Sequence, residues 1–191
     1  MDNARTSDLL ERLGALIRAE RRRLAAAHDL KLVQLDALAY LARANRYSDS
    51  PAAVTDWLGS TKGTVSQTVG VLERKGLVEK RDDPDDRRRV HLQLTKAGRR
   101  VLKDTDPAPL LTEAIARIGG DGGLAERLMI LLRELQRRSG ARSFGICNTC
   151  RFFGREDDRF RCGLTGERLS VDDSELICRE HESAARGAVA G

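Results

Sequence analysis

The sequence predicts a mainly α-helical fold with one small β-hairpin, followed by a helical region and a short cysteine-rich module. Three observations support this fold class. Apolar residues recur at helical spacing over most of residues 7–138. Two short segments suited to strands flank a loop at Pro84, in the pattern of a hairpin. All four cysteines lie within the last 45 positions.

The helices of the N-terminal part are expected from their apolar spacing and their end signals. They cover about 7–27 starting near Ser7, about 30–44, a short segment from Pro51 to Gly59, and about 61–75 between Thr61 and Gly76. Hydroxyl side chains cap helix N-termini, proline suits a first helical turn, and glycine commonly follows a last one. The segments therefore begin and end where local chemistry favours it.

The helix expected at 61–75 has an unusual polar face. Val65, Val69 and Leu72 form its inward stripe. The residues off that stripe are short and polar: Lys62, Gly63, Thr64, Ser66, Gln67 and Gly70. An ordinary exposed face would carry Glu, Lys and Arg, which favour helix more strongly. Small hydrogen-bonding residues instead suggest a face that lies close against a partner.

A hairpin and further helices are expected after this helix. Leu77–Lys80 and Val90–Leu94 are expected to pair, with R-D-D-P-D-D-R-R-R between them. Thr95 caps a helix that runs to about Asp104. The segment 106–109 interrupts it, because proline removes a backbone donor. Leucines at helical spacing indicate a last helix over about 124–138.

The composition is typical of a cytoplasmic globular protein. Of the 191 residues, 40% are hydrophobic and 33% are charged, which suits one domain with an accessory unit. No apolar run approaches the ~18 residues of a membrane span, so no membrane partner is expected. The first residues carry acids and arginines where a secretory signal would be apolar.

The net charge of +5 is concentrated in one region. Residues 51–103 hold 12 Lys or Arg and 7 Asp or Glu, and the rest of the chain is neutral. Such a local excess is typical of a surface that binds a polyanion.

The order of the elements predicts a winged helix-turn-helix over about 30–103. Its polar-faced helix would lie in the major groove of double-stranded DNA, where Gln67 can pair with adenine and Lys62 can meet phosphate. Thr64 and Ser66 can contact either base or phosphate. In the wing, Arg87, Arg88 and Arg89 could reach a minor groove, whose negative potential attracts arginine. Asp86 is close enough in sequence to brace one of them.

Residues 61–98 resemble the core of the MarR family of bacterial transcription regulators. The match covers Leu72-Glu73-Arg74-Lys75-Gly76-Leu77-Val78 at a helix end, Asp83-Pro84 with Asp86-Arg87-Arg88 in the wing, and Leu94-Thr95 with Gly98 at the close. Flanking helices extend the resemblance over roughly residues 5–138.

The resemblance implies a homodimer formed by helices at about 7–27 and 108–138, bound to a pseudo-palindromic operator. It also implies a regulator that is not an enzyme, usually a repressor, often with a small aromatic inducer. Two features depart from the family. Pro107 and Pro109 break a helix that usually runs long, and the cysteine-rich tail, which follows a linker at 139–146, is not a family feature.

The tail predicts a metal-bound module over 147–181, followed by a flexible end at 182–191. The candidate ligands are Cys147, Cys150, Cys162 and Cys178, with His181 as a fifth candidate, in the spacing C-x2-C-x11-C-x15-C-x2-H. In a reducing cytoplasm clustered cysteines more often bind metal than form disulfides. A unit of 35 residues is too small to fold by burial alone and needs a cross-link.

The identity and role of that cross-link stay open at the level of sequence. Zinc is the first interpretation, and an iron–sulfur cluster is the second, since both take cysteine thiolates. Two disulfides and free thiols are further alternatives. The module could be structural, could sense metal or redox state, or could recruit another protein. A rival function is a thiol oxidoreductase using Cys147 and Cys150, although the βαβ pattern usual for that class is missing.

Overall fold

The structure is a computed structural model, and it describes residues 2–84, 86, 88–156 and 159–183. The helices are α1 (Asn3–Ala27), α2 (Leu32–Leu41), α3 (Pro51–Leu58), α4 (Lys62–Arg74), α5 (Lys96–Thr105), α6 (Pro109–Arg117), α7 (Leu124–Ser139), the 3-10 turn η1 (Cys147–Thr149) and α8 (Val171–Glu175). The strands are β1 (Val78–Asp82), β2 (Val90–Leu94), β3 (Gly145–Ile146), β4 (Phe153–Glu156), β5 (Arg159–Cys162), β6 (Arg168–Leu169) and β7 (Ile177–Cys178).

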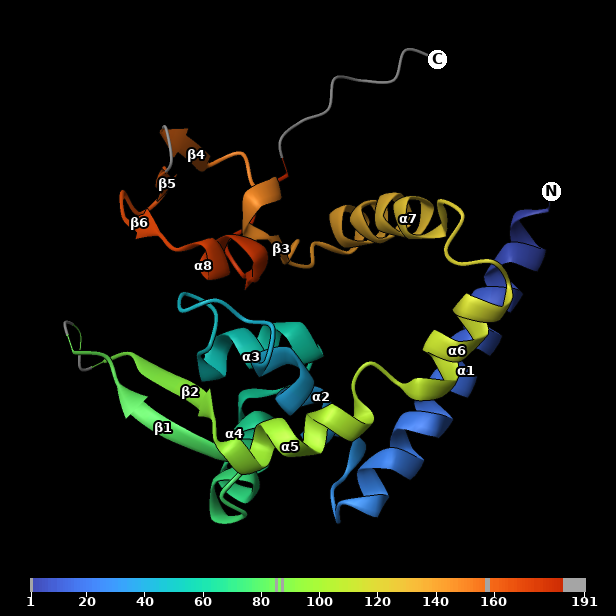
Figure 1. Ribbon diagram of the computed structural model, residues 1–191, viewed down its shortest axis with the longest axis horizontal. Coiled ribbons are helices and arrows are strands. Elements are labelled where there is room, and N and C mark those ends of the chain that lie inside the picture. The colour runs from blue at the N-terminus through green and yellow to red at the C-terminus, as the bar shows by residue number, and fades with distance from the viewer. Residues whose placement is uncertain (1, 85, 87, 157–158, 184–191) are drawn as a thin grey trace.

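Helices α2, α3 and α4 and the hairpin β1–β2 form a winged helix-turn-helix, which confirms this part of the predicted fold class (Figure 1). The two strands pair antiparallel, with Val78 opposite Leu94. Thr61 caps α4 as predicted, accepting from Thr64 N, and Ser50, which was not predicted as a cap, accepts from Ala53 N at the start of α3. The first cap differs from the prediction, because Asp2 rather than Ser7 accepts from Ala4 N and starts α1.

One apolar core joins these elements. Leu35 and Leu38 of α2, Leu72 of α4 and Leu92 of β2 are almost fully buried in it. The predicted inward stripe of α4 is confirmed, since its valines and Leu72 are at most 2% exposed.

The apolar stripes at both ends of the helical region lie outside this core. Neither α6 nor α7 has a buried residue. The exposed large apolar side chains include Leu9, Leu13 and Leu16 of α1, Leu110 of α6, and Leu124, Leu128, Leu131, Leu132 and Leu135 of α7. Helical spacing predicted these residues as packed, and within a single chain they are not.

The predicted break between α5 and α6 is confirmed, and buried charges fix its geometry. Glu20 of α1 is buried and accepts a hydrogen bond from Leu110 N at 3.0 Å, at the uncapped start of α6. The guanidinium of Arg21 bonds Asp36 at 2.9 Å and Asp106 at 3.0 Å. Charged hydrogen bonds therefore tie α1 to α2 and to the turn after α5.

The C-terminal module lies over α2 and α3, and α4 and the wing lie on the other side of those helices (Figure 1). It contains the pair β3–β7 and the three-stranded sheet β4–β5–β6. The linker expected at 139–146 differs from the structure, because Gly145 and Ile146 form β3. Ile177 of β7 is 7% exposed and belongs to the core of the winged helix. Among the described helices, none is both long and apolar enough to cross a membrane.

Candidate nucleic-acid interface and cysteine module

The predicted base-reading residues share the outer face of α4. Lys62, Thr64, Ser66 and Gln67 are all exposed. The neighbouring side chains Val65 and Thr68 are buried, so the helix is held with this face outward. The Thr64 hydroxyl already has one hydrogen-bond partner, since it lies 2.9 Å from the Thr61 hydroxyl at the helix start. An exposed helix of this kind can enter a major groove.

The wing presents an arginine braced by an aspartate. Arg88 Nε donates to Asp86 Oδ1 at 3.0 Å, as the sequence suggested, and the Arg88 side chain is 91% exposed. The Arg88 side chain also lowers the pKa of Asp86, mainly through this bond. Arg89 is exposed and pairs with Asp86 at 3.6 Å. Arg87 lies outside the described residues.

His91 of β2 contacts two aspartates, one in the wing and one in the loop before α3. These contacts were not predicted from the sequence. Its Nδ1 lies 2.6 Å from Asp49 Oδ1, and its Nε2 lies 3.0 Å from Asp83 Oδ2. The hydrogen bond with Asp83 is the main reason that the pKa of His91 is raised. Burial raises the pKa of Asp49, and the His91 ring opposes that rise. Asp49 is in the loop between α2 and α3, so this ring links the wing to the helix-turn-helix.

A hollow of about 300 Å³ lies beside the outer face of α4. It is lined by Pro51, Ala52 and Thr55 of α3, Lys62, Ser66 and Val69 of α4, and Lys80 of β1. Its size is that of a small-ligand pocket, and two lysines give it a positive lining.

The four cysteines line one small cavity in the C-terminal module. With them are Phe152, Phe153, Leu164 and Glu180. The cavity measures about 20 Å³, which is room for roughly one water-sized atom. In the part of the chain that the structure describes, no group of three or more Cys, His, Asp or Glu side chains has the arrangement of a metal site. The sulfurs thus face one space without the close approach that a bound ion would impose.

Burial raises the pKa of two of these thiols, Cys147 and Cys178. Burial, with a smaller contribution from the neighbouring cysteines, raises the pKa of Cys147 to about 12. A redox-active C-x2-C pair needs a lowered thiol pKa, so Cys147 does not suit a thiol oxidoreductase. A cation in the cavity would reverse this effect, because a coordinating thiol loses its proton.

His181 lies beside the cavity but does not line it. Its Nε2 is 2.9 Å from Thr149 Oγ1, and Ser143 Oγ donates to its backbone oxygen. The ring is buried against Gly145, where an added Cβ would lie 2.5 Å from it. These contacts fit a packing role for His181 rather than the ligand role suggested by its spacing.

Two buried polar residues of the winged helix reach the cysteine module. Asn45 and Ser48, between α2 and α3, are 0% exposed. Burial raises the pKa of Cys178, and the Asn45 amide and the Ser48 hydroxyl oppose that rise by hydrogen bonding. Asn45 Nδ2 nevertheless has no hydrogen bond of ordinary geometry to a described atom. The amide is therefore close to Cys178 but imperfectly satisfied by a neutral thiol.

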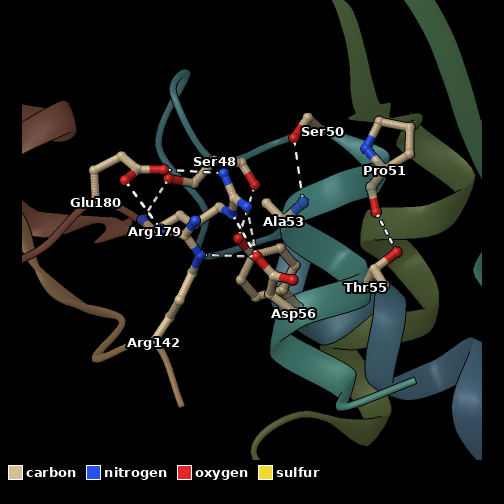
Figure 2. Close-up of polar contacts among 10 residues, drawn as sticks. Ser48, Ser50, Pro51, Ala53, Thr55, Asp56, Arg142, Arg179 and Glu180 are labelled. Carbon is tan, nitrogen blue, oxygen red and sulfur yellow. Dashed lines mark hydrogen bonds and ion pairs between the residues drawn. The ribbon is translucent and has the colours of Figure 1, made fainter. Parts of the chain in front are cut away.

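Arginines and aromatic rings complete the contact between module and winged helix. Arg179, next to Cys178, donates to Asp56 of α3 at 2.6 and 2.8 Å, and Arg142 reaches the same carboxylate at 3.0 Å (Figure 2). Phe144 packs edge-on against Tyr40 and Trp57, with ring centroids 5.9 and 5.2 Å away. Sequence gave no sign of this contact, because its members are widely separated along the chain.

The fold and the exposed polar helix define the class: this chain is a winged helix-turn-helix protein. Residues 28–89 match the sequence profile of the MarR family. A 71-residue stretch is 34% identical to the transcriptional repressor MprA of Escherichia coli, covering 37% of this chain and 40% of that repressor.

Solved structures agree on the fold. MepR of S. aureus in its DNA-binding conformation has a TM-score of 0.61 at 20% identity, covering 70% of this chain and 98% of MepR. CouR of Rhodococcus jostii RHA1, bound to p-coumaroyl-CoA, has a TM-score of 0.54 at 21% identity, covering 66% of this chain and 88% of CouR. The sequence match to the MarR family thus covers the winged helix of this chain, and the solved structures show the same fold.

Proposed function

We propose that this protein is a DNA-binding transcription regulator of the cytoplasm that reads double-stranded DNA with α4. One observation carries the proposal: Lys62, Ser66 and Gln67 share the exposed face of the recognition helix in a winged helix of MarR type. Gln67 would read a base edge and Lys62 would meet phosphate. Arg88 and Arg89, exposed on the wing, would approach the neighbouring minor groove.

The working form we propose is a homodimer on a pseudo-palindromic operator. The leucines of α1 and α7 form apolar stripes that a single chain leaves exposed. A second copy of the chain would cover them, since exposed apolar patches of this kind mark protein contacts. Two recognition helices related by a two-fold axis would then meet two half-sites.

Repression relieved by a small molecule is the mode of action that we propose. The relative from E. coli is a transcriptional repressor, and CouR holds p-coumaroyl-CoA. In this chain the hollow between α3 and α4 includes Lys62 and Ser66 of the DNA-reading face. An anionic ligand held there by Lys62 and Lys80 would occupy space that the DNA needs.

For the C-terminal module we propose a single zinc ion held by Cys147, Cys150, Cys162 and Cys178. Four thiolates complete a tetrahedral zinc site, and the ion would supply the cross-link that so small a module needs. The size of the cavity supports one ion, because about 20 Å³ suits a single atom. An iron–sulfur cluster brings four or more atoms and would need the cysteines to move apart.

The DNA-reading role is tested by selecting duplexes from a random pool with the full-length protein and then comparing variants. Gln67→Ala should lose preference at one base position, by ~1–3 kcal/mol, while keeping its affinity for random DNA. Lys62→Ala is the matched control and should weaken binding to selected and random duplexes equally. Equal losses on both duplexes for Gln67→Ala would rule out base reading by that residue.

The metal proposal has its own measurement. Protein purified without oxygen should contain one zinc per chain and show no absorption near 400 nm. Iron with sulfide, or fully titratable thiols with no metal, would overturn it.

A further inference from the structure

The last strand of the module, β7, forms backbone hydrogen bonds with the winged helix. Ile177 N donates to Arg43 O at 2.7 Å, and Asn45 N donates to Ile177 O at 2.9 Å. On its other side, β7 pairs with β3. The strand therefore lies between module and winged helix, and Cys178 follows Ile177 directly. Cys178 is thus one residue away from the backbone hydrogen bonds that join β7 to the segment leading into α3.

Asn45 and Ser48 contact the residues on either side of Cys178: Asn45 N donates to Ile177 O at 2.9 Å, and Ser48 Oγ accepts from Arg179 N at 2.8 Å. Asn45 and Ser48 are completely buried, and Asn45 Nδ2 has no hydrogen bond of ordinary geometry within the described residues. A neutral thiol is a weak acceptor, whereas a metal-bound thiolate accepts hydrogen bonds readily. Donors that point at the ligand atoms are the usual outer support of a metal site.

The same loop positions the helix-turn-helix. Ser48 Oγ accepts from Arg179 N at 2.8 Å, and two residues later Ser50 caps α3. Arg179 also donates a hydrogen bond to the Asp56 carboxylate on α3 (Figure 2). Because α3 packs directly on α4, a continuous path of contacts leads from Cys178 to the DNA-reading face.

We propose that Asn45 and Ser48 are positioning residues of the cysteine metal site, and that zinc at this site sets the placement of α3 and α4 and so raises DNA affinity. This inference rests on the zinc site and the DNA binding proposed above. With zinc bound, the Cys178 thiolate would hold both donors in place. Without zinc, the buried Asn45 amide loses its acceptor and the loop before α3 loses a fixed point.

The first experiment measures zinc affinity by competition with a chelator in the full-length, reduced protein. Two variants remove the donors: Ser48→Ala, and Asn45→Asp, which keeps the oxygen that accepts from Tyr47 N at 3.1 Å. Both should weaken zinc binding about 10- to 100-fold. Cobalt(II) in place of zinc should show a shifted thiolate charge-transfer band, which a purely structural loss would not produce.

The matched control is Arg46→Gln. Arg46 also joins the winged helix to the module, through Arg168 O at 2.6 Å and Glu167 at 3.4 Å, but it does not support a cysteine. It should leave zinc affinity within twofold and the cobalt spectrum unchanged. Ser48→Ala should still fold, because the backbone oxygen that accepts from Tyr40 Oη at 2.7 Å is kept. Wild-type zinc affinity and cobalt spectra in both donor variants would overturn the positioning role.

The second experiment measures the link to DNA. Affinity for a duplex selected by the zinc form is compared with and without zinc, while circular dichroism follows the helices. We expect zinc to strengthen DNA binding at least fivefold with the helices intact, and DNA to strengthen zinc binding by the same factor, since coupling is reciprocal. Equal DNA affinity in both forms would overturn the coupling, as would a loss that appears only when the helices unfold.

The possible failures are distinguishable. Absence of DNA binding in every form would remove the proposed function and the coupling, whereas the positioning role would still be decided by zinc affinity alone. A reduced protein that binds no zinc would overturn the whole inference while leaving operator binding in place.

Discussion

Replacing Ile177 by alanine should destabilise the winged helix, although the residue belongs to the C-terminal module. Ile177 is 7% exposed and contributes to the core that holds Leu35, Leu38 and Leu72. The change removes three carbon atoms, worth about 0.8 kcal/mol each when buried, or about 2.4 kcal/mol. A partly relaxed cavity adds to this loss, so we expect the free energy of unfolding to fall by about 3 kcal/mol.

Urea unfolding followed by tryptophan fluorescence measures this loss. Trp57 is the single tryptophan of the chain and packs against Phe144 of the module, so its emission reports on the docked state. The control is Val171→Ala, a change in the same module at a residue that is 63% exposed. It should cost no more than about 0.5 kcal/mol. Protein concentration is held constant, because dimerisation would contribute to the measured stability.

The reasoning fails if Ile177→Ala lowers the free energy of unfolding by less than about 1 kcal/mol with an unchanged urea slope. The module would then rest on the winged helix without completing its core. A separate early change in Trp57 emission, while circular dichroism shows the helices still folded, would lead to the same conclusion.

Two further predictions concern the wing and the proposed dimer. Because Asp83 and Asp49 raise the pKa of His91, its stabilising effect should be complete below about pH 6.5 and lost as the pH rises through the raised value. Wild type should therefore exceed His91→Gln in unfolding free energy by more at pH 6 than at pH 8.5, and a constant difference would refute this link. Leu132→Glu should weaken the dimer about 100-fold or more in sedimentation, because it buries an unpaired charge. Glu126→Gln, outside the leucine stripe of the same helix, should leave the dimer intact; if both variants dissociate alike, the stripe is not the interface.

Much of the winged helix follows from short-range signals in the sequence. Val65, Val69 and Leu72 recur at the helical period, and the packing of α4 confirms them. The hairpin differs only in the bounds of its first strand, since β1 runs from Val78 to Asp82 rather than from Leu77 to Lys80. These features depend on neighbours within a few positions, so a single sequence is enough to predict them.

The attachment of the module could not be predicted in the same way. A two-residue strand such as β7 has no detectable period, and its partner at Ala44 lies far away along the chain. Asn45 and Ser48 are polar residues in a connection, where exposure is the usual expectation, yet both are fully buried. For the leucines of α7 the sequence predicts burial and the structure shows exposure. Their regular helical spacing is typical of packed residues, but within a single chain no described segment buries them.

The position of Ile177 in the core also bears on how the protein is made. Ribosomes extend a chain at about 5–20 residues per second, so roughly 4–15 s separate the synthesis of the end of α5 from that of Ile177. During that interval the nascent winged helix has all its helices and its hairpin but lacks one of its core side chains. The core behind α4 is therefore completed only after Ile177 has been synthesised, and a chain that stops before Ile177 would carry α4 on a core that lacks this side chain.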